Sequence, residues 1–461
     1  MAIQRIFNTH SIYEKIRSRC LRNEKEYLAF CIITILLLLG LNSFYYVFKE
    51  AMGFSRGTFF FDVNDRFADI IKMALSYKYI LLKCQDLTEN IGRLSQIYQS
   101  YFYNNPYTNN INSGTITHFH ITPLSTLLNI AVAVAVGNGN SPRIILSMLF
   151  IFCMSIAFIS TYTIVKSVKK SMVLTTLILI SYPLLFTITR GNYFGLICGT
   201  GIISFLNALF INRKIDLFTV LLVGVAINIR PNAAVLLVGL PLLLGIKKSI
   251  LPAVKILLLS ATLFFVSYVI VNMVYPSYTI HNFLSALSVY SRMYVDSGWG
   301  DRFNSSLFSV VKEIGHMVKL GDGTIKVIFS GISLAAISWL FKLVFQKRVI
   351  CEYFPFILSS VYVMFTPVLG DYHLLVFVVP IFLIYLGWQS WKSYQKELLI
   401  VTISTILILV PKNYLYWHSH GGVSFQVFIN PTILFCTTIY LLYKNEKIKT
   451  ATYFQNNKMP G

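Results

Sequence analysis

Three aspartates lie within eight residues in a chain of 461 residues that has only 18 acidic side chains. Asp62, Asp65 and Asp69 follow a hydrophobic run, in the sequence FFFDVNDRFAD. On a helix, their i, i+3, i+7 spacing places the three carboxylates on one face. One of them could act as a general base if a nearby cation or a dry pocket adjusts its pKa. The alternative is that all three form the solvated face of an amphipathic helix at a membrane surface.

Other polar side chains occur where apolar segments begin or end. An arginine can bind a phosphate through two parallel hydrogen bonds, so arginines at a membrane surface suit a lipid phosphate. Singly, each residue has a simpler interpretation: Arg190 could contact lipid headgroups, and His373 could cap its helix. Together with Asp69, the candidate substrate-binding residues are His118, His120, Arg190, Asn192, Arg230, Asn232, Arg292, Asn304 and His373.

The composition defines the class of protein that must position these residues. Hydrophobic residues make up 56% of the chain, charged residues make up 12%, and the mean hydropathy is +0.65. Many apolar runs approach or exceed the ~20 residues that cross a bilayer as a helix. We therefore predict an all-α polytopic membrane protein. The net charge of +21 is spread over loops between apolar runs, which fits cytoplasmic loops and argues against nucleic-acid binding.

The basic residues predict a topology. Short basic loops at 166–170, 213–214, 247–248, 346–348 and 392–396 are expected in the cytoplasm, with the N-terminal segment 1–27 and the tail 444–461. The basic segment 1–27 is not expected to be a cleaved signal. About twelve spans then form one domain, residues 28–443: 28–48, 143–165, 171–189, 193–211, 216–229, 232–246, 251–274, 324–345, 352–370, 373–390, 398–411 and 425–443.

This topology leaves external loops at about 49–142, 275–323 and 412–424. The apolar run 121–136 would reverse all the later loops if it crossed, so we expect it to lie on or dip into the outer leaflet. Between 216–229 and 232–246, Pro231 is expected to break the helix and to leave Arg230 at or below the outer surface. Whether this pair of segments spans twice or is re-entrant stays open.

No cofactor is indicated by the sequence. Seven cysteines are scattered without a C-x-x-C motif, and neither glycine-rich nucleotide-binding motif is present. His418 and His420 lack a nearby third metal ligand. A divalent cation is therefore possible for the chemistry but is not indicated.

The order and placement of these motifs resemble the GT-C superfamily of membrane glycosyltransferases, especially the glycosyltransferase 87 family. The resemblance covers about residues 30–390. Three departures are Thr122 in place of a proline, Arg230 in place of a lysine, and Val63 in place of an aromatic residue. The motifs are Asp62-Val63-Asn64-Asp65, His120-Ile121-Thr122-Pro123-Leu124, Arg190-Gly191-Asn192, Arg230-Pro231-Asn232, Asn304-Ser305-Ser306-Leu307 and His373-Leu374-Leu375.

The resemblance implies a GT-C-like bundle whose long first external loop contains interfacial helices. It also implies a sugar donor on polyprenyl phosphate, a glycan or glycolipid acceptor, and inversion at the anomeric carbon. Asp62 or Asp65 would be the general base, and Arg190, Arg230 or Arg292 would stabilise the departing phosphate. The polyprenyl donor suggests the external face of a bacterial plasma membrane. The sugar, the acceptor and the oligomeric state are not readable from the sequence.

Two other classes stay open from the sequence alone. A polysaccharide polymerase or ligase of the O-antigen type also joins lipid-linked sugars outside the membrane. A lipid-linked glycan transporter could use broken helices with an arginine, although we find no internal repeat of the kind that such transporters show.

Overall fold

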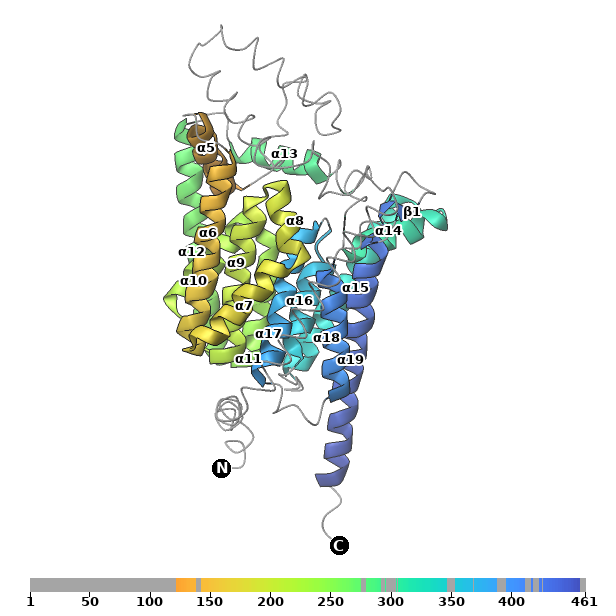
Figure 1. Cartoon of the computed structure of the whole chain (residues 1–461). Helices are drawn as coiled ribbons and strands as arrows, with labels where there is room; N and C mark the ends of the chain where they lie inside the picture. Colours follow the sequence, from red (N-terminus) through yellow and green to blue (C-terminus); the bar gives the residue numbers. More distant parts are fainter. Residues whose placement is uncertain are drawn as a thin grey trace, which may run out of the picture.

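The computed structural model describes residues 122–137, 142–274, 279–291, 295, 304, 306–345, 353–367, 369–387, 395–410, 416–417, 423–424 and 426–456. Within these residues the chain is a bundle of helices (Figure 1). The exception is a short antiparallel ladder between β1, Tyr416–Trp417, and β2, Val423–Ser424. The prediction of an all-α protein is confirmed for the described residues.

Four helices in the described part of the chain are long and apolar enough to cross a membrane. They lie within α6 (Pro142–Val165), α9 with its π-helical end η4 (Tyr193–Asn212), α12 (Ile246–Val274) and α15 (Asp322–Phe345). The outer faces of α6, α12 and α15 carry exposed apolar side chains, as for Met148 at 67%, Met273 at 79% and Val327 at 72% exposure. Continuous apolar surface of this kind suits contact with lipid. The coarse prediction of a membrane protein with several spanning helices therefore holds.

A fifth span is formed if α7 (Val168–Ile180) and α8 (Tyr182–Arg190) are counted together. The sequence predicted one segment at 171–189, whereas the structure bends it by 63° between the two helices. Pro183 stands in the first turn of α8, where its missing N–H costs nothing, and Ser181 is extended between the helices. The bend turns α8 away from the direction of α7.

The remaining helices are shorter or run along the edge of the bundle. They are α5 (Pro123–Gly137), α10 (Leu217–Ile229), η5 (Pro231–Val238), α11 (Gly239–Leu244), α13 (Ile280–Ser291), α14 (Leu307–Met317), α16 (Phe354–Met364), η8 (Asp371–Phe377), α17 (Val378–Gly387), α18 (Gln395–Leu409) and α19 (Gln426–Asn456).

The predicted break after residue 229 is confirmed, but the segment after it is not an ordinary α-helix. Arg230 has an extended backbone, as expected for a residue before proline, and Pro231 begins the 3₁₀-helix η5. A 3₁₀-helix rises ~2.0 Å per residue instead of ~1.5 Å. The pair η5 and α11 therefore reaches about 25 Å, where the same residues in an α-helix would reach about 21 Å.

The apolar run predicted not to cross forms α5, which packs against α6, α10 and α12. At 15 residues it is about 22 Å long, shorter than ~30 Å of hydrocarbon. Its polar side chains lie on one buried face, which is turned into the bundle and not toward lipid. They are Ser125, Thr126 and Asn129, together with Thr122 directly before the helix.

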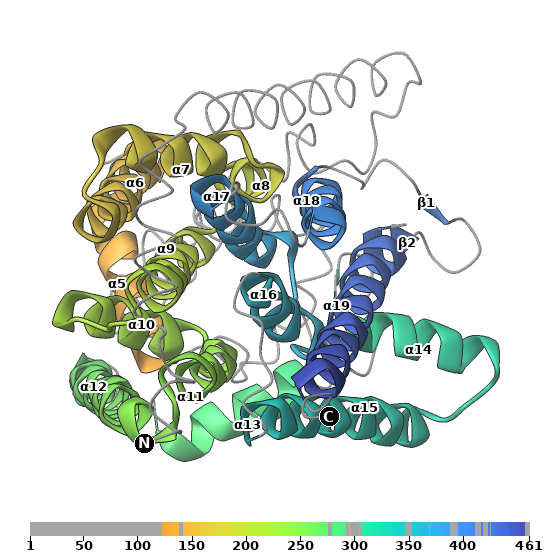
Figure 2. The same ribbon diagram turned by 90° about the horizontal axis from the view of Figure 1, so that it is seen from below.

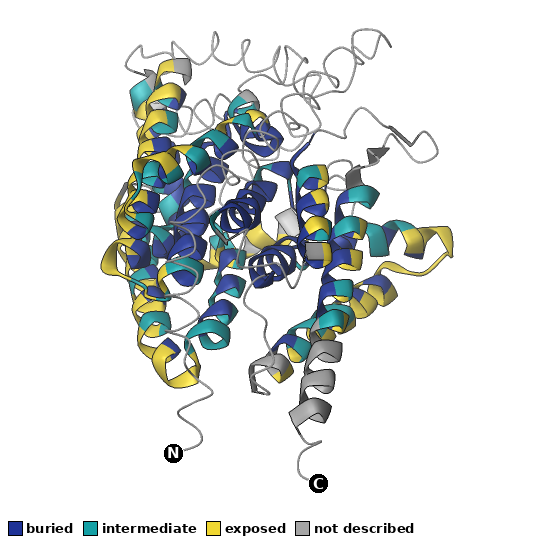
Figure 3. Ribbon diagram, turned by 60° about the horizontal axis from the view of Figure 1, so that its bottom comes forward, coloured by how far each residue is buried: buried dark blue, intermediate teal, exposed yellow. Residues whose placement is uncertain are grey.

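Helix α9 lies at the centre of the half of the bundle that α6, α10 and η8 surround (Figure 2). Its span is 83% buried, whereas the span of α15 is 17% buried. Gly201 lets the α10 backbone approach closely, because a Cβ at this position would lie 2.6 Å from the Leu222 carbonyl oxygen. Across α6 and α9, the Ser160 hydroxyl donates to the Ser204 hydroxyl at 2.8 Å, and both side chains are buried. The buried centre of the bundle is shown in dark blue in Figure 3.

The two ends of the bundle differ in charge. The junctions of α6 with α7, η4 with α10, and α11 with α12 lie at the lower end in Figure 1. These junctions carry the basic pairs and clusters at 166–170, 213–214 and 247–248. The helix breaks that carry the candidate site residues lie at the opposite end, with α5 and α13.

Candidate functional site

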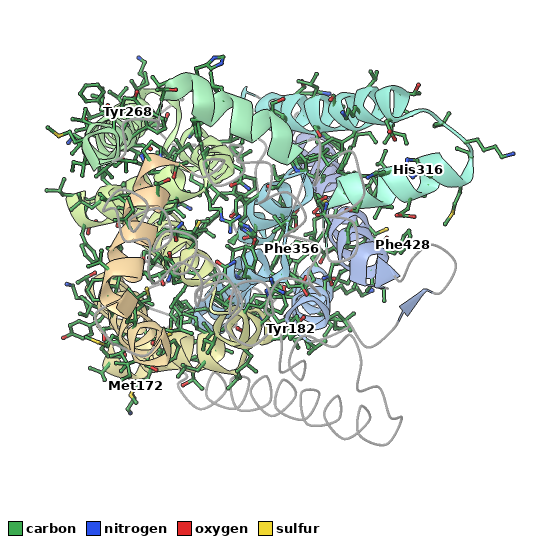
Figure 4. The ribbon with its side chains drawn as sticks, turned by 90° about the horizontal axis from the view of Figure 1, so that it is seen from above. Met172, Tyr182, Tyr268, His316, Phe356 and Phe428 are labelled. Atoms are coloured by element: carbon green, nitrogen blue, oxygen red, sulfur yellow. The ribbon has the colours of Figure 1, made fainter. Side chains whose placement is uncertain are left out.

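Three helix breaks meet at the end of the bundle opposite the basic loops. They are the α8 region, the α10–η5 break and the link from α16 to η8. Helix α8 contacts η8, and helix α16 contacts both η5 and η8. Figure 4 views this end from above, with Tyr182 of α8 labelled beside the central helices. We call the group of Arg230, Tyr362, Tyr372 and His373 the Arg230–His373 cluster.

Arg230 is half-buried at the helix break. Its backbone N–H still donates to the Ala226 carbonyl at 2.8 Å, so α10 fixes its position even though its own conformation is extended. Its Nη2 donates to the Tyr372 hydroxyl at 3.1 Å, and its Cζ lies 4.9 Å from the centre of that ring. A guanidinium in this position gains both a hydrogen bond and a cation–π contact.

His373 lies at the beginning of η8 and is 5% exposed. Its Nδ1 is 2.6 Å from the hydroxyl of Tyr362 in α16. If that hydroxyl donates, the proton of the neutral imidazole lies on Nε2. Among the described residues Nε2 has no hydrogen-bond partner. A buried nitrogen without a partner is costly, so this atom is suited to contact a bound substrate.

Tyr182 and Asp371 join α8 to η8. The Tyr182 hydroxyl donates to Asp371 Oδ2 at 2.9 Å, and both side chains are 1% exposed. One turn later in α8, Phe186 stacks on Tyr372 with 6.4 Å between ring centres and 14° between planes. Helix α8 therefore supports the cluster along the side of Tyr372.

Two predicted asparagines tie other elements to the end of α16. Asn232 Nδ2 donates to the Thr366 hydroxyl at 2.9 Å. Asn304 Nδ2 donates to the Pro367 carbonyl at 2.7 Å, and its Oδ1 accepts from the N–H groups of Ser306 at 3.1 Å and Leu369 at 2.8 Å. The structure thus brings four predicted residues to one junction: Arg230, Asn232, Asn304 and His373. The two asparagines form hydrogen bonds with backbone and hydroxyl groups of the junction.

Arg190 and Asn192 lie at the break between α8 and α9. Asn192 is the N-cap of α9, and its Oδ1 accepts from the Gly195 N–H at 2.8 Å. Asn192 therefore has a structural role, and its contact with a substrate stays a prediction. Arg190 is half-buried at the last position of α8.

The remaining predicted residues lie outside the described residues. They include both candidate bases and the third arginine: Asp62, Asp65, Asp69, His118, His120 and Arg292. The proposed base therefore stays a prediction.

Three tyrosines of this site, Tyr182, Tyr362 and Tyr372, were not predicted as site residues, and two of them have distant partners. Tyr362 lies within an apolar segment, and Tyr182 precedes Pro183 at a break that the sequence did not separate from its span. A buried tyrosine normally requires a hydrogen-bond partner for its hydroxyl. That general rule marks both residues as candidates, but it does not identify partners 11 and 189 residues away.

No metal centre is formed by the described residues, since they include no group of three or more histidine, cysteine, aspartate or glutamate side chains that could hold an ion. Comparison with known proteins finds no family model, no curated protein and no solved structure that matches the chain. The functional argument therefore depends on the residues and on their arrangement.

Proposed function

We propose that this chain is an integral-membrane glycosyltransferase that takes a sugar from a polyprenyl-phosphate donor. The observation that carries the proposal is the Arg230–His373 cluster, where a guanidinium and a buried histidine from different helix breaks meet at the end opposite the basic loops. A cation and a free polar nitrogen at a bundle end suit the phosphate and the sugar of a lipid-linked donor. The motif order that resembles the GT-C superfamily supports the same class.

The chemistry is a single inverting displacement. The acceptor hydroxyl attacks the anomeric carbon and forms a new glycosidic bond, while the bond from that carbon to the phosphate oxygen breaks. The acceptor proton passes to Asp62 or Asp65. Arg230 would stabilise the growing charge of the leaving polyprenyl phosphate, and His373 would hold the donor through Nε2.

The proposed membrane topology has about twelve spans with both termini in the cytoplasm. The basic loops at one end of the bundle support a cytoplasmic assignment for that end. The cluster then lies at the external face, where a glycan or lipid-linked glycan acceptor and the donor lipid could both reach it.

The proposal is tested with membranes that contain the full chain and a panel of radiolabelled polyprenyl-phosphate sugars. We expect transfer from at least one donor. Either Asp62→Asn or Asp65→Asn should lower the rate by about 100-fold or more, the usual contribution of a general base. Asp322→Asn is the control, because that carboxylate is exposed, lies at the start of α15 and forms a salt bridge with the exposed His316.

Two results would count against the proposal. If no donor in the panel is used, the glycosyltransferase assignment fails. If transfer survives both aspartate substitutions, the chain is better explained as a polymerase or ligase, and transport of the labelled lipid without transfer would indicate a transporter.

A further inference from the structure

We infer that the buried polar face of α5 is a subsite for a neutral sugar ring, with the side-chain amide of Asn129 donating a hydrogen bond to a sugar hydroxyl. The inference rests on the proposed function and deepens it. It adds a residue that neither the sequence motifs nor the Arg230–His373 cluster includes.

Helix α5 turns its few polar side chains into the bundle, although the rest of the helix is apolar. Ser125 and Asn129 are four residues apart, so they lie on one face, and each is 1% exposed. The Thr122 hydroxyl donates to the Ser125 hydroxyl at 3.0 Å. Polar groups in such a setting cost free energy unless they are hydrogen-bonded, so each of them requires a partner.

Asn129 has only half of its amide satisfied. Its Oδ1 accepts a hydrogen bond from the Tyr193 hydroxyl, which ties α5 to α9. Its Nδ2 carries two N–H donors and has no hydrogen-bond partner among the described residues. A buried donor left in this state costs about 1–3 kcal/mol. A ligand oxygen that accepts from Nδ2 would remove this cost.

This amide lies close to the candidate site. Tyr193 is the first residue of α9, directly after the α8–α9 break. It belongs to a buried apolar cluster that also includes Val132 of α5 and Ile229 of α10. Ile229 directly precedes Arg230, so this cluster connects the surroundings of Asn129 to the α10–η5 break. Both lie at the end of the bundle opposite the basic loops (Figure 1).

The chemistry of α5 favours a neutral ligand that bears hydroxyl groups. The helix contains no charged side chain, so it offers no cation for a phosphate. A lipid chain would leave the amide of Asn129 unsatisfied. A sugar hydroxyl oxygen can accept from Nδ2, and a few placed polar groups in a mostly apolar wall are typical of small-molecule sites. The sugar can belong to the donor or to the acceptor, because both present the same hydroxyl chemistry.

The experiment measures Kd values for the full chain in lipid nanodiscs with three kinds of probe. They are bare polyprenyl phosphate, polyprenyl-phosphate mannose, glucose and galactose, and the octyl glycosides of the same three hexoses. We expect Asn129→Leu to raise the Kd for a sugar-bearing probe about tenfold, which corresponds to ~1.4 kcal/mol, and to leave the Kd for bare polyprenyl phosphate unchanged. An effect on the lipid-linked sugars assigns the subsite to the donor, and an effect confined to the octyl glycosides assigns it to the acceptor.

A double variant separates sugar binding from a purely structural role. Asn129→Leu alone leaves the Tyr193 hydroxyl without its acceptor on α5 and is expected to lower the apparent Tm. Adding Tyr193→Phe removes both partners of that hydrogen bond, which should recover much of the Tm. The Kd for the sugar-bearing probe should stay about tenfold raised. If the amide only held α5 against α9, the Kd would return toward the wild-type value together with the Tm.

Asn207→Leu is the matched control. Asn207 is also fully buried and has an amide oxygen without a hydrogen-bond partner among the described residues. It lies at the other end of α9, directly before η4 and toward the basic loops. Its substitution should leave the Kd of every probe unchanged, whatever its effect on Tm.

Failure of this inference can be distinguished from failure of the proposed function. If the wild-type chain neither binds polyprenyl phosphate nor transfers sugar from any donor, the function is wrong. If the wild type does both, the inference alone is overturned by wild-type Kd values in Asn129→Leu, or by an equal rise for bare polyprenyl phosphate. Asn129 would then hold a buried water and no sugar.

Discussion

His373 illustrates how a structural contact can fix one ring nitrogen and leave the other for the proposed contact with the donor. Its Nδ1 is occupied by the Tyr362 hydroxyl at 2.6 Å, which fixes the ring, while Nε2 has no hydrogen-bond partner among the described residues. Histidine orientation is commonly set in this way, by the hydrogen bond that the other ring nitrogen makes. The ring is thus fixed before a substrate arrives.

We expect Tyr362→Phe to destabilise the protein, because it leaves His373 Nδ1 buried without its partner. The expected loss is about 1–3 kcal/mol in the free energy of unfolding. Thermal unfolding in detergent measures it as a lower apparent Tm. Tyr162→Phe is the control, since Tyr162 is 42% exposed on α6. Equal Tm values for the two variants would contradict the assigned role of Tyr362.

At the residue scale, the sequence predicted Arg230 and His373 of the cluster but not its two tyrosines. Arg230 could be predicted because an arginine beside a proline in an apolar stretch must lie at a helix break. Tyr362 could not be assigned, since 28 tyrosines occur in the chain and many of them could anchor at a membrane surface. Only the fold shows which hydroxyl meets His373.

The helices that enter the site begin as 3₁₀-helices. Both η5 and η8 begin at the junction, and each continues as an α-helix, α11 or α17, toward the basic end. The pair η8 and α17 reaches about 29 Å, although its 17 residues would make an α-helix of only about 26 Å. The sequence predicted both breaks, but it could not predict the helix type, because hydrophobic periodicity over seven or eight residues does not separate the two geometries.

Asn304 should control the link between α16 and η8. We expect Asn304→Ala to speed hydrogen exchange at the Leu369 N–H, which now donates to Asn304 Oδ1 at 2.8 Å. The loss of three hydrogen bonds should cost about 3 kcal/mol in the free energy of unfolding. Mass spectrometry of peptides that cover the link measures the exchange.

Ser306→Ala is the control for this element. It removes only the Ser306 hydroxyl bond to the Pro367 carbonyl at 3.0 Å and leaves both acceptor contacts of Asn304 in place. The Leu369 N–H should then keep its slow exchange. Unchanged exchange in Asn304→Ala would show that the link is held by other contacts.

At the scale of the whole molecule, the separation of basic loops from the cluster is the main basis for the proposed orientation. The positions of the basic loops were predictable because cytoplasmic loops retain lysine and arginine. The bend between α7 and α8 was not predicted, because both halves are apolar and together form a run of ordinary length. The packing of the helices decides which helix ends with polar residues come together. The order of the motifs along the chain does not determine this.

The orientation can be tested by labelling cysteines in a variant whose seven natural cysteines are replaced by serine. We expect a membrane-impermeant maleimide to label His281→Cys on α13 in right-side-out vesicles. Lys214→Cys, at the junction before α10, should be labelled only after the vesicles are opened. Both positions are exposed. The reverse pattern would place the cluster at the cytoplasmic face and would contradict the proposed donor site.

The hydroxyl pair between α6 and α9 limits how α6 can be turned about its own axis. Ser160 meets Ser204 in the buried interface, while Met148, Ile151 and Phe152 on other positions of α6 are exposed. Rotating α6 by half a turn would present a hydroxyl to hydrocarbon and move three large apolar groups against α9. In the assembled bundle, α6 therefore has one favoured rotation about its own axis.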